Sequence, residues 1–258
     1  MKQNYILECC VDSVASAIAA EKGGADRLEL CANLIIGGTT PPFSLFQAVK
    51  KAVSIPVHVL LRPRFGDFCY DGFEKEMLLA DIKQFEKEGA DGIVIGALNP
   101  DGTLDSDFLT QMLTHSKTMH RTLHRAFDMC LDGKEALKTA SNLKFNTILT
   151  SGLANTALDG IDMLRTLAPL ADELGITLMA GSGINADAIR TLTESIPLHV
   201  FHMSGKMELN STMKYRNPFV NMGLPGFSEY VVYQTNSEEI KAAKDVLKSL
   251  PIFRSSLA

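Results

Sequence analysis

The sequence predicts an α/β protein that consists of a single (β/α)8, or TIM, barrel over residues 1–258. Short apolar runs that are rich in β-branched residues alternate about eight times with longer helical patterns, as expected for stacked βα units. Eight such units in 258 residues match the usual length of a closed barrel. The competing architecture, a doubly wound open sheet, is less well supported because its early glycine fingerprint is missing.

Each strand is expected where one of the apolar runs occurs. The eight predicted strands are 6–10, 27–31, 57–61, 92–95, 122–124, 147–150, 177–179 and 200–203. Asp12 and Ser13 are typical of the start of a helix, and glycines 23–24 are typical of its end. The phrase Gly-Ala-Asp occurs at 24–26 and again at 89–91, directly before the second and fourth strands. This recurrence indicates the helix-to-strand turn of a repeated unit.

The segment 205–235 departs from this pattern, because it separates the eighth strand from the last helix by roughly 30 residues. Unstructured loops of this length are uncommon in compact domains, and many are lids or binding loops. The segment contains Lys206 and three methionines. It could fold over the barrel mouth, or it could be a surface excursion or an oligomer contact. Asn236 or Ser237 is expected to begin the last helix.

Composition and charge narrow the classes of partner. A net charge of -5 gives no support for a nucleic-acid binder. No apolar run approaches the roughly 18 residues of a membrane helix, and no organic cofactor is predicted. The first residues lack a signal-peptide pattern, and five cysteines, an odd number, do not form a disulfide framework. We therefore expect a cytoplasmic protein with five free thiols, and a homodimer, because barrels of this kind often pair.

Polar side chains gather where the predicted strands end, which is the end of a barrel that carries active sites. Residues two apart on a strand share a face, so Glu8 lies with Cys10 and Glu29 lies with Cys31. The other polar candidates are Arg62, Arg64, His124, Arg125, Asp128, Thr150, Ser151, Ser182, His202 and Ser204. A ligand pocket is the simpler interpretation, because buried polar groups are costly unless they are paired. The alternative is a set of internal salt bridges, for example between Glu8 or Glu29 and Arg62.

The two thiols that face inward, Cys10 and Cys31, suit a soft metal ion. Neighbouring strands lie about 4.8 Å apart, so both sulfurs could bind one Cu(I) or zinc ion. Against this, the sequence has no CxxC spacing, and buried single cysteines are often small core residues. The spacing alone leaves both interpretations open.

A second set of residues suggests proton transfer on an anionic substrate. His124 could act as a general base or acid with Asp128 orienting it, or it could satisfy a hydrogen bond within the barrel. Glu8, Glu29 and Arg62 complete the catalytic candidates. Barrels often bind phosphate in the loops after strands seven and eight, where this chain has glycine-rich turns. The anion-binding candidates are Arg64, Ser182, Gly183, Ser204 and Lys206.

Several phrases of the sequence resemble the CutC family of copper homeostasis proteins. They are residues 8–13, 23–31, 62–68, 124–129 and 149–152, and the similarity extends to segment 213–217. The resemblance implies a cytoplasmic (β/α)8 barrel that is associated with copper tolerance and binds Cu(I) through Cys10 and Cys31. The chain differs from the family pattern at Phe65, where a second glycine is usual, and at Ala180, where a proline is usual.

Two functions are compatible with these observations. The first is a copper homeostasis protein that binds Cu(I) at the barrel mouth, with the loop methionines as further soft donors. The second is a barrel enzyme, such as a lyase or epimerase, that acts on a small anionic or phosphorylated metabolite. An aldolase that forms a Schiff base is disfavoured because no predicted strand contains a lysine, and a scaffolding role is least favoured.

Overall fold

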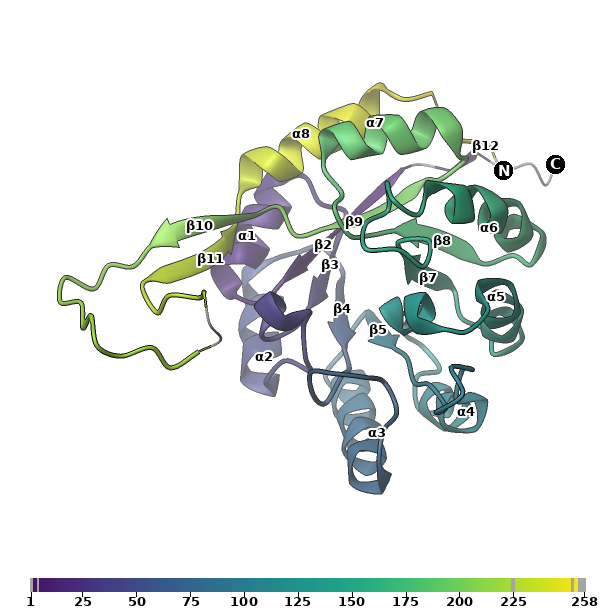
Figure 1. The fold of residues 1–258 in the computed structure, drawn as a ribbon, viewed down its shortest axis with the longest axis horizontal. Helices are drawn as coiled ribbons and strands as arrows, with labels where there is room; N and C mark the ends of the chain where they lie inside the picture. The colour runs from purple at the N-terminus through teal and green to yellow at the C-terminus, as the bar shows by residue number, and fades with distance from the viewer. Residues whose placement is uncertain (1, 4, 224–225, 252, 255–258) are drawn as a thin grey trace.

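A closed barrel of eight parallel strands forms the centre of the protein, and helices surround it (Figure 1). The computed structural model describes residues 2–3, 5–223, 226–251 and 253–254. The barrel strands are β2 (Ile6–Val11), β3 (Arg27–Leu30), β4 (Val57–Leu60), β5 (Gly92–Ile95), β6 (His120–Leu123), β7 (Thr147–Thr150), β8 (Thr177–Ala180) and β9 (Val200–Met203). The α-helices are α1 (Val14–Gly23), α2 (Phe43–Ala52), α3 (Gly72–Lys87), α4 (Ser106–Thr114), α5 (Gly133–Asn142), α6 (Ile161–Glu173), α7 (Ala186–Ser195) and α8 (Ser237–Ser249). The predicted (β/α)8 barrel is confirmed.

Seven of the eight barrel strands begin at the predicted residue, and only β6 begins earlier. It starts at His120 rather than at residue 122. The two added residues, His120 and Arg121, are polar, so the apolar pattern does not reveal them. The structure also adds two short 3-10 helices after strands, η1 (Leu34–Ile36) and η2 (Arg125–Met129).

The repeated Gly-Ala-Asp phrase has the same role at both of its positions. The Asp26 carboxylate accepts a hydrogen bond from the backbone N–H of Leu7 on the neighbouring strand, at 2.7 Å. The Asp91 carboxylate accepts one from the backbone N–H of Val57, at 2.8 Å. Each aspartate therefore joins the start of its own strand to the start of the strand beside it, which helps to set the barrel register.

The barrel has separate outer and inner cores. Outward-facing residues such as Leu28, Ile93 and Phe201 pack in one large apolar cluster with the helices. The interior holds two small apolar clusters, one of Cys31, Leu60 and Val94 and one of Leu149, Met179 and Val200. Polar and charged side chains occupy the inner surface between them, and these form the candidate site.

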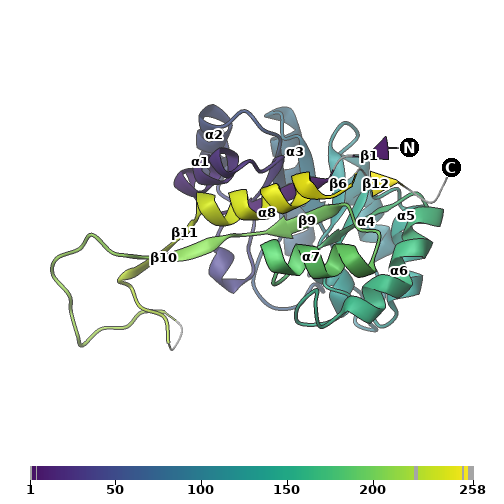
Figure 2. The same ribbon diagram turned by 90° about the horizontal axis from the view of Figure 1, so that it is seen from above.

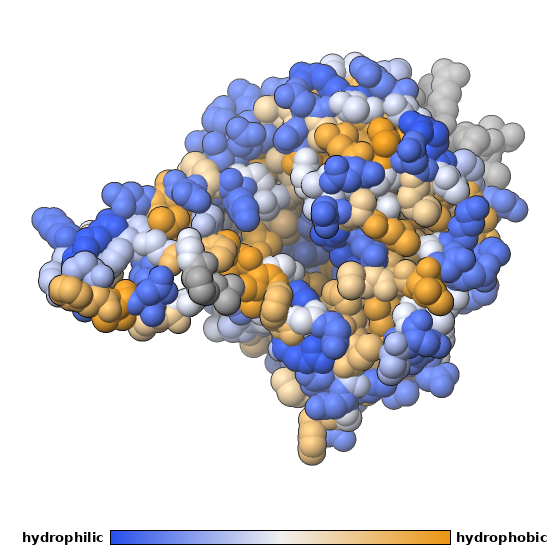
Figure 3. All heavy atoms as spheres, viewed as in Figure 1, coloured by the Kyte–Doolittle hydropathy of each residue, from blue (hydrophilic) through white to orange (hydrophobic). Residues whose placement is uncertain are grey.

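The segment predicted as a long loop at 205–235 contains an antiparallel hairpin of β10 (Lys206–Asn210) and β11 (Val231–Thr235). This arm projects away from the barrel and does not fold over its mouth (Figures 1 and 2). The segment is therefore not a loop throughout, because its two ends pair as strands and residues 206–210 alternate between exposed and half-buried. Apolar side chains lie exposed on the arm (Figure 3), including Met213, Phe219 and Met222.

A further short pair, β1 (Lys2–Gln3) and β12 (Phe253–Arg254), joins the two ends of the chain. All five cysteines are unpaired, as predicted. In the part of the chain that the structure describes, no helix has both the length and the apolar character to cross a membrane. The homodimer stays a prediction.

Candidate functional site

The inward-facing side chains of β2 and β3 meet inside the barrel, as the strand pattern predicted. The two strands are parallel neighbours, and their register places Cys10 opposite Glu29. Glu8, Cys10, Glu29 and Cys31 are all buried, with no more than 6% of any of them exposed. Two carboxyl groups and two thiols therefore line one wall of the barrel near its carboxyl end.

Glu8 lies at the centre of a charged cluster. Its carboxylate pairs with Arg27, Nδ1 of His202 lies 2.9 Å from its Oε1, and Nδ1 of His58 lies 3.6 Å from its Oε2. Burial alone would raise the pKa of Glu8, but Arg27 and His202 outweigh it and hold the pKa well below its usual range. The alternative interpretation, an internal salt bridge, is therefore met in part, but the partner is Arg27 and not Arg62. Arg27 lies directly opposite Glu8 in the register, whereas Arg62 follows the end of β4.

The carboxyl group of Glu29 is in a different environment. Its Oε2 makes no hydrogen bond with any described residue. Burial raises the pKa of Glu29 to about 7, with the nearby charge of Glu8 adding to the rise and His202 opposing it. Ligand atoms of Glu8, Glu29 and His202 all lie within 4.8 Å of one another. Such a group can exchange protons or bind a cation.

His202 is the third member of this cluster. Burial lowers the pKa of His202, but Cys10 and Glu29 raise it more, so the pKa lies well above its usual value. The imidazole therefore carries its positive charge between a thiol and two carboxyl groups.

Cys31 lies further toward the barrel mouth. Its side chain packs with Leu60 and Val94 beneath Leu34 of η1, and its Sγ lies 3.6 Å from the carbonyl oxygen of Val11. Burial raises the pKa of the Cys31 thiol well above its usual value, and the neighbouring Cys10 raises it further. The thiol is therefore protonated in the absence of a ligand that displaces the proton.

Arg62 and His124 follow the ends of β4 and β6. The Arg62 guanidinium donates to the carbonyl oxygens of Gly38 at 3.2 Å and Gly66 at 2.8 Å. Nδ1 of His124 accepts a hydrogen bond from the backbone N–H of Ala126 at 3.1 Å. Burial and, to a smaller extent, the charge of Arg62 lower the pKa of His124 to about 3. His124 is therefore neutral near pH 7.

Glycines on and after β5 leave room for two histidine rings. A Cβ added at Gly92 would lie 2.5 Å from the His58 ring, and one added at Gly96 would lie 2.5 Å from the His124 ring. Both distances are far below any ordinary carbon contact. Any side chain at these two positions would displace the rings that form the polar inner surface.

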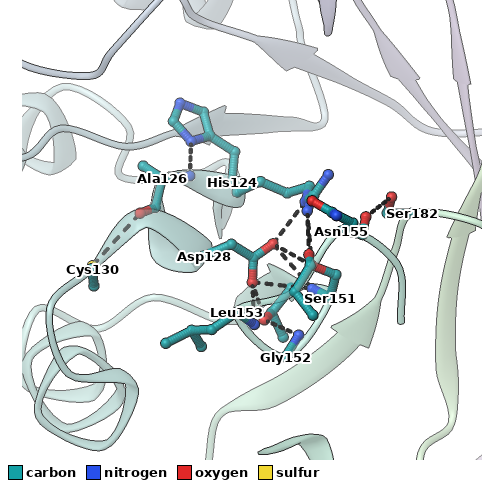
Figure 4. A network of polar contacts seen from close by, with 12 residues as sticks. His124, Ala126, Asp128, Cys130, Ser151, Gly152, Leu153, Asn155 and Ser182 are labelled. Atoms are coloured by element: carbon teal, nitrogen blue, oxygen red, sulfur yellow. Dashed lines mark hydrogen bonds and ion pairs between the residues drawn. The ribbon is translucent and has the colours of Figure 1, made fainter. Parts of the chain in front are cut away.

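Asp128 does not orient His124, so that expectation is wrong. Its carboxylate instead accepts hydrogen bonds from the hydroxyl of Thr150 at 2.5 Å, from the backbone and side chain of Ser151, and from the guanidinium of Arg125 at 2.7 Å (Figure 4). His124 already receives its hydrogen bond from the backbone of η2. The contacts of Asp128 hold the loops after β6 and β7 together.

Arg64, the first of the predicted anion-binding residues, already has anionic partners. Its guanidinium pairs with Glu74 at 2.6 Å and with Asp67 at 3.0 Å. These carboxylates already neutralise the positive charge that an anionic ligand would need.

The other four anion-binding candidates come from two separate regions. Ser182 and Gly183 form a turn with positive φ angles of 69° and 73°, and the Ser182 hydroxyl donates to the carbonyl of Asn155 at 2.7 Å. Ser204 follows β9, and Lys206 belongs to the arm, where its ammonium lies over a tyrosine ring of β11 at 5.6 Å. No contact found among the described residues links the two pairs. The phosphate site stays a prediction.

Arg27 and His58 are site residues that the sequence analysis did not select. Arg27 could have been found, because it lies two residues before Glu29 on the same strand and so shares its face. His58 stacks on His120 inside the barrel, with ring centroids 4.9 Å apart. A strand that is buried on both faces has no alternation of apolar and polar residues to separate inward from outward side chains. The sequence therefore did not indicate that His58 faces the barrel interior.

The low pKa of His124 predicts an acid-sensitive contribution to stability. Its folded pKa of about 3 lies below the ordinary histidine value of 6.5, so the unfolded state binds the proton first. The stability is present above pH 6.5 and is lost as the pH falls, by about 1.4 kcal/mol per unit. Urea unfolding of His124→Asn should therefore show a pH slope that is smaller by that amount. An unchanged slope for His124→Asn would contradict the prediction.

The family model and the curated relatives point to one family. The sequence model of the CutC family matches residues 5–207. The "Copper homeostasis protein cutC homolog" of Mus musculus is 41% identical over 248 residues, which cover 94% of this chain and 91% of that protein. A family protein CutC of Bacteroides fragilis is 39% identical over 249 residues, which cover 96% of this chain and 98% of that protein.

Solved structures agree with the fold. The putative copper homeostasis protein CutC of Streptococcus agalactiae is 26% identical, with a TM-score of 0.72 over 78% of this chain and 98% of that chain. A thiamine phosphate pyrophosphorylase of Pyrococcus furiosus is 12% identical with a TM-score of 0.56, covering 95% of this chain and 96% of that chain. This second likeness shows the barrel fold alone.

Proposed function

Because the chain belongs to the CutC family of copper homeostasis proteins, we propose that it binds Cu(I) at the barrel mouth through Cys10 and Cys31. One observation carries the proposal: two buried, unpaired thiols face the barrel interior from the carboxyl ends of neighbouring strands.

The donor set fits Cu(I). Thiolate sulfur suits this soft ion better than it suits magnesium or calcium. The surroundings of Cys31 are apolar, since Leu60 and Val94 pack against it, and such surroundings exclude water from a metal site. The thiols would bind as thiolates and release their protons on metal binding.

The proposed location of this copper binding is the cytoplasm. All five cysteines are free, which is the usual state of thiols in a reducing compartment. Free thiols also remain available to Cu(I), whereas an oxidising compartment would favour disulfides.

Titration of the reduced protein with Cu(I) under anaerobic conditions, followed by X-ray absorption spectroscopy, tests the proposal. We expect one tightly bound ion per chain with sulfur neighbours. A copper ion that has only nitrogen and oxygen neighbours would exclude Cys10 and Cys31 as ligands.

Proton transfer is a second candidate function, and the environment of Glu29 favours it. One oxygen of this buried carboxyl group has no partner among the described residues, and both Glu8 and His202 lie within 4.8 Å. A carboxyl group in this position can give or accept a proton from a bound molecule. Schiff-base chemistry stays disfavoured, because none of the barrel strands contains a lysine.

The proton-transfer candidate predicts exchange of carbon-bound hydrogen with solvent. Small keto and hydroxy acids that are incubated with the protein in D2O should gain deuterium. The loss of their 1H NMR signals measures this exchange. Glu29→Gln should slow the exchange by about 10²- to 10⁴-fold, because it removes the group that carries the proton. The exposed variant Asp162→Asn is the control. Equal exchange in parent protein and Glu29→Gln would eliminate Glu29 from this role.

A further inference from the structure

Three buried polar side chains near the carboxyl ends of β4 and β6 each have an atom without a hydrogen-bond partner among the described residues. The atoms are Nε of Arg62, the hydroxyl oxygen of Tyr70 and Nε2 of His124. The three residues are only 8%, 8% and 4% exposed, respectively. Buried polar groups are paired in the great majority of native sites, so three unpaired atoms in one region need an explanation.

Arg62 is a buried cation with no carboxylate partner in the described part of the chain. A guanidinium has five N–H donors. Three contacts go to backbone carbonyls, those of Gly37 at 3.4 Å, Gly38 at 3.2 Å and Gly66 at 2.8 Å. The Nε–H and one further N–H are left over, which is the number that a carboxylate takes in a bidentate pair.

His124 presents a fixed donor. Because its Nδ1 accepts the hydrogen bond from the backbone N–H of Ala126, the proton of the neutral ring lies on Nε2. This Nε2–H is the unpaired atom. Tyr70 supplies a hydroxyl that can also donate. The three side chains therefore offer donors, and none of them carries a negative charge near pH 7.

Phe68 links two of the three groups. The Phe68 ring lies 5.0 Å from the Arg62 guanidinium carbon and 4.9 Å from the His124 ring centroid. Tyr70 belongs to the same loop as Arg62 and Phe68, and Arg64 of that loop lies over the Tyr70 ring at 5.7 Å. Arg62 and Tyr70 thus come from one loop, and Phe68 of that loop packs against His124.

We propose that Arg62, Tyr70 and His124 bind the carboxylate group of a small metabolite. The pairing would neutralise the buried charge of Arg62 and give each unpaired donor an acceptor. The site differs in position from the predicted phosphate loops after β8 and β9. It shares no ligand with the copper proposal, and it concerns binding only, so it does not depend on proton transfer.

NMR of protein labelled with 15N-histidine tests the inference directly. The Nε2–H signal of His124, assigned by its loss in His124→Asn, should shift on titration with acetate or pyruvate. Tyr70→Phe removes a hydroxyl that has no partner among the described residues, so the fold should be retained while carboxylate affinity falls about tenfold. Arg62→Lys keeps the charge but loses the planar pair of donors, and we expect a loss of about tenfold or more. The exposed variant Arg165→Lys is the matched control.

The response of the His124 signal in each variant supports or excludes the carboxylate site. A carboxylate-dependent shift that is weakened in Tyr70→Phe and Arg62→Lys, but not in Arg165→Lys, supports the site. Retention of the shift in a variant that lacks Cys10 and Cys31 separates it from copper binding. Three results would overturn the inference: no shift with either carboxylate, a shift with inorganic phosphate alone, or parent affinity in both Tyr70→Phe and Arg62→Lys.

Discussion

Replacement of both Cys10 and Cys31 by serine is expected to weaken Cu(I) binding by more than about 100-fold. Loss of a residue that only supports a metal ligand typically lowers metal affinity by about 10- to 100-fold, and loss of the ligands themselves should cost more. Serine is close in size to cysteine, but its hydroxyl oxygen is a poor donor for a soft ion. Competition of the purified protein with a Cu(I)-specific chromophoric chelator measures the change. Each single variant should lose most of this affinity, since one remaining thiol cannot provide the pair.

The matched control removes two thiols elsewhere. Cys9 packs on the outer face of the barrel with the helices, and Cys130 lies after η2, so Cys9→Ala with Cys130→Ala should keep the parent affinity. Equal losses in the two double variants would mean that copper binds thiols without regard to their position. Circular dichroism of each variant shows whether the barrel is retained.

The pH dependence of copper binding gives an independent check. Burial and the neighbouring Cys10 raise the pKa of Cys31 well above its usual value, so near pH 7 this thiol must lose a proton to bind the metal. The apparent affinity should therefore rise by about tenfold per pH unit for that proton. This rise should disappear in Cys31→Ser.

The fold could be predicted because the chain repeats one unit. Apolar runs predict the barrel strands. Ser13 begins the first helix because its side chain accepts a hydrogen bond from the helix backbone, and Gly24 ends that helix because it adopts a positive φ angle. The pairing of Glu8 with Cys10 and of Glu29 with Cys31 followed from side-chain alternation alone. These features depend on residues that are close in sequence, and local patterns report them well.

Features that depend on register across the barrel could not be predicted. Glu8 pairs with Arg27 and His202 because both lie opposite it on neighbouring strands. Asp128 turns toward Ser151 because the loop after β7 offers it several donors at once. The composition of the arm likewise did not reveal that β10 and β11 pair, although paired residues such as Glu208 and Tyr233 are 25 positions apart in the sequence.

Glu8→Gln is expected to lower the free energy of unfolding by about 3–5 kcal/mol, the usual cost of removing one partner from a buried ion pair. Glu8 is fully buried, and its loss leaves Arg27 and the charged His202 ring without their anion. The lowered pKa of Glu8 means that its contribution is present above pH 4.5 and is lost as the pH falls below it, so the penalty of the variant should shrink in acid.

A double-mutant cycle separates this effect from a simple packing defect. Arg27→Met removes the unpaired cation, so the combined variant with Glu8→Gln should be less destabilised than the sum of the two single variants. Asp162→Asn breaks an exposed ion pair with Arg165 and should cost no more than about 1 kcal/mol. Urea unfolding measures the free energy of unfolding of the parent protein and of all four variants. If Glu8→Gln costs as little as Asp162→Asn, the charged cluster contributes little to stability, and its burial must be explained by function alone.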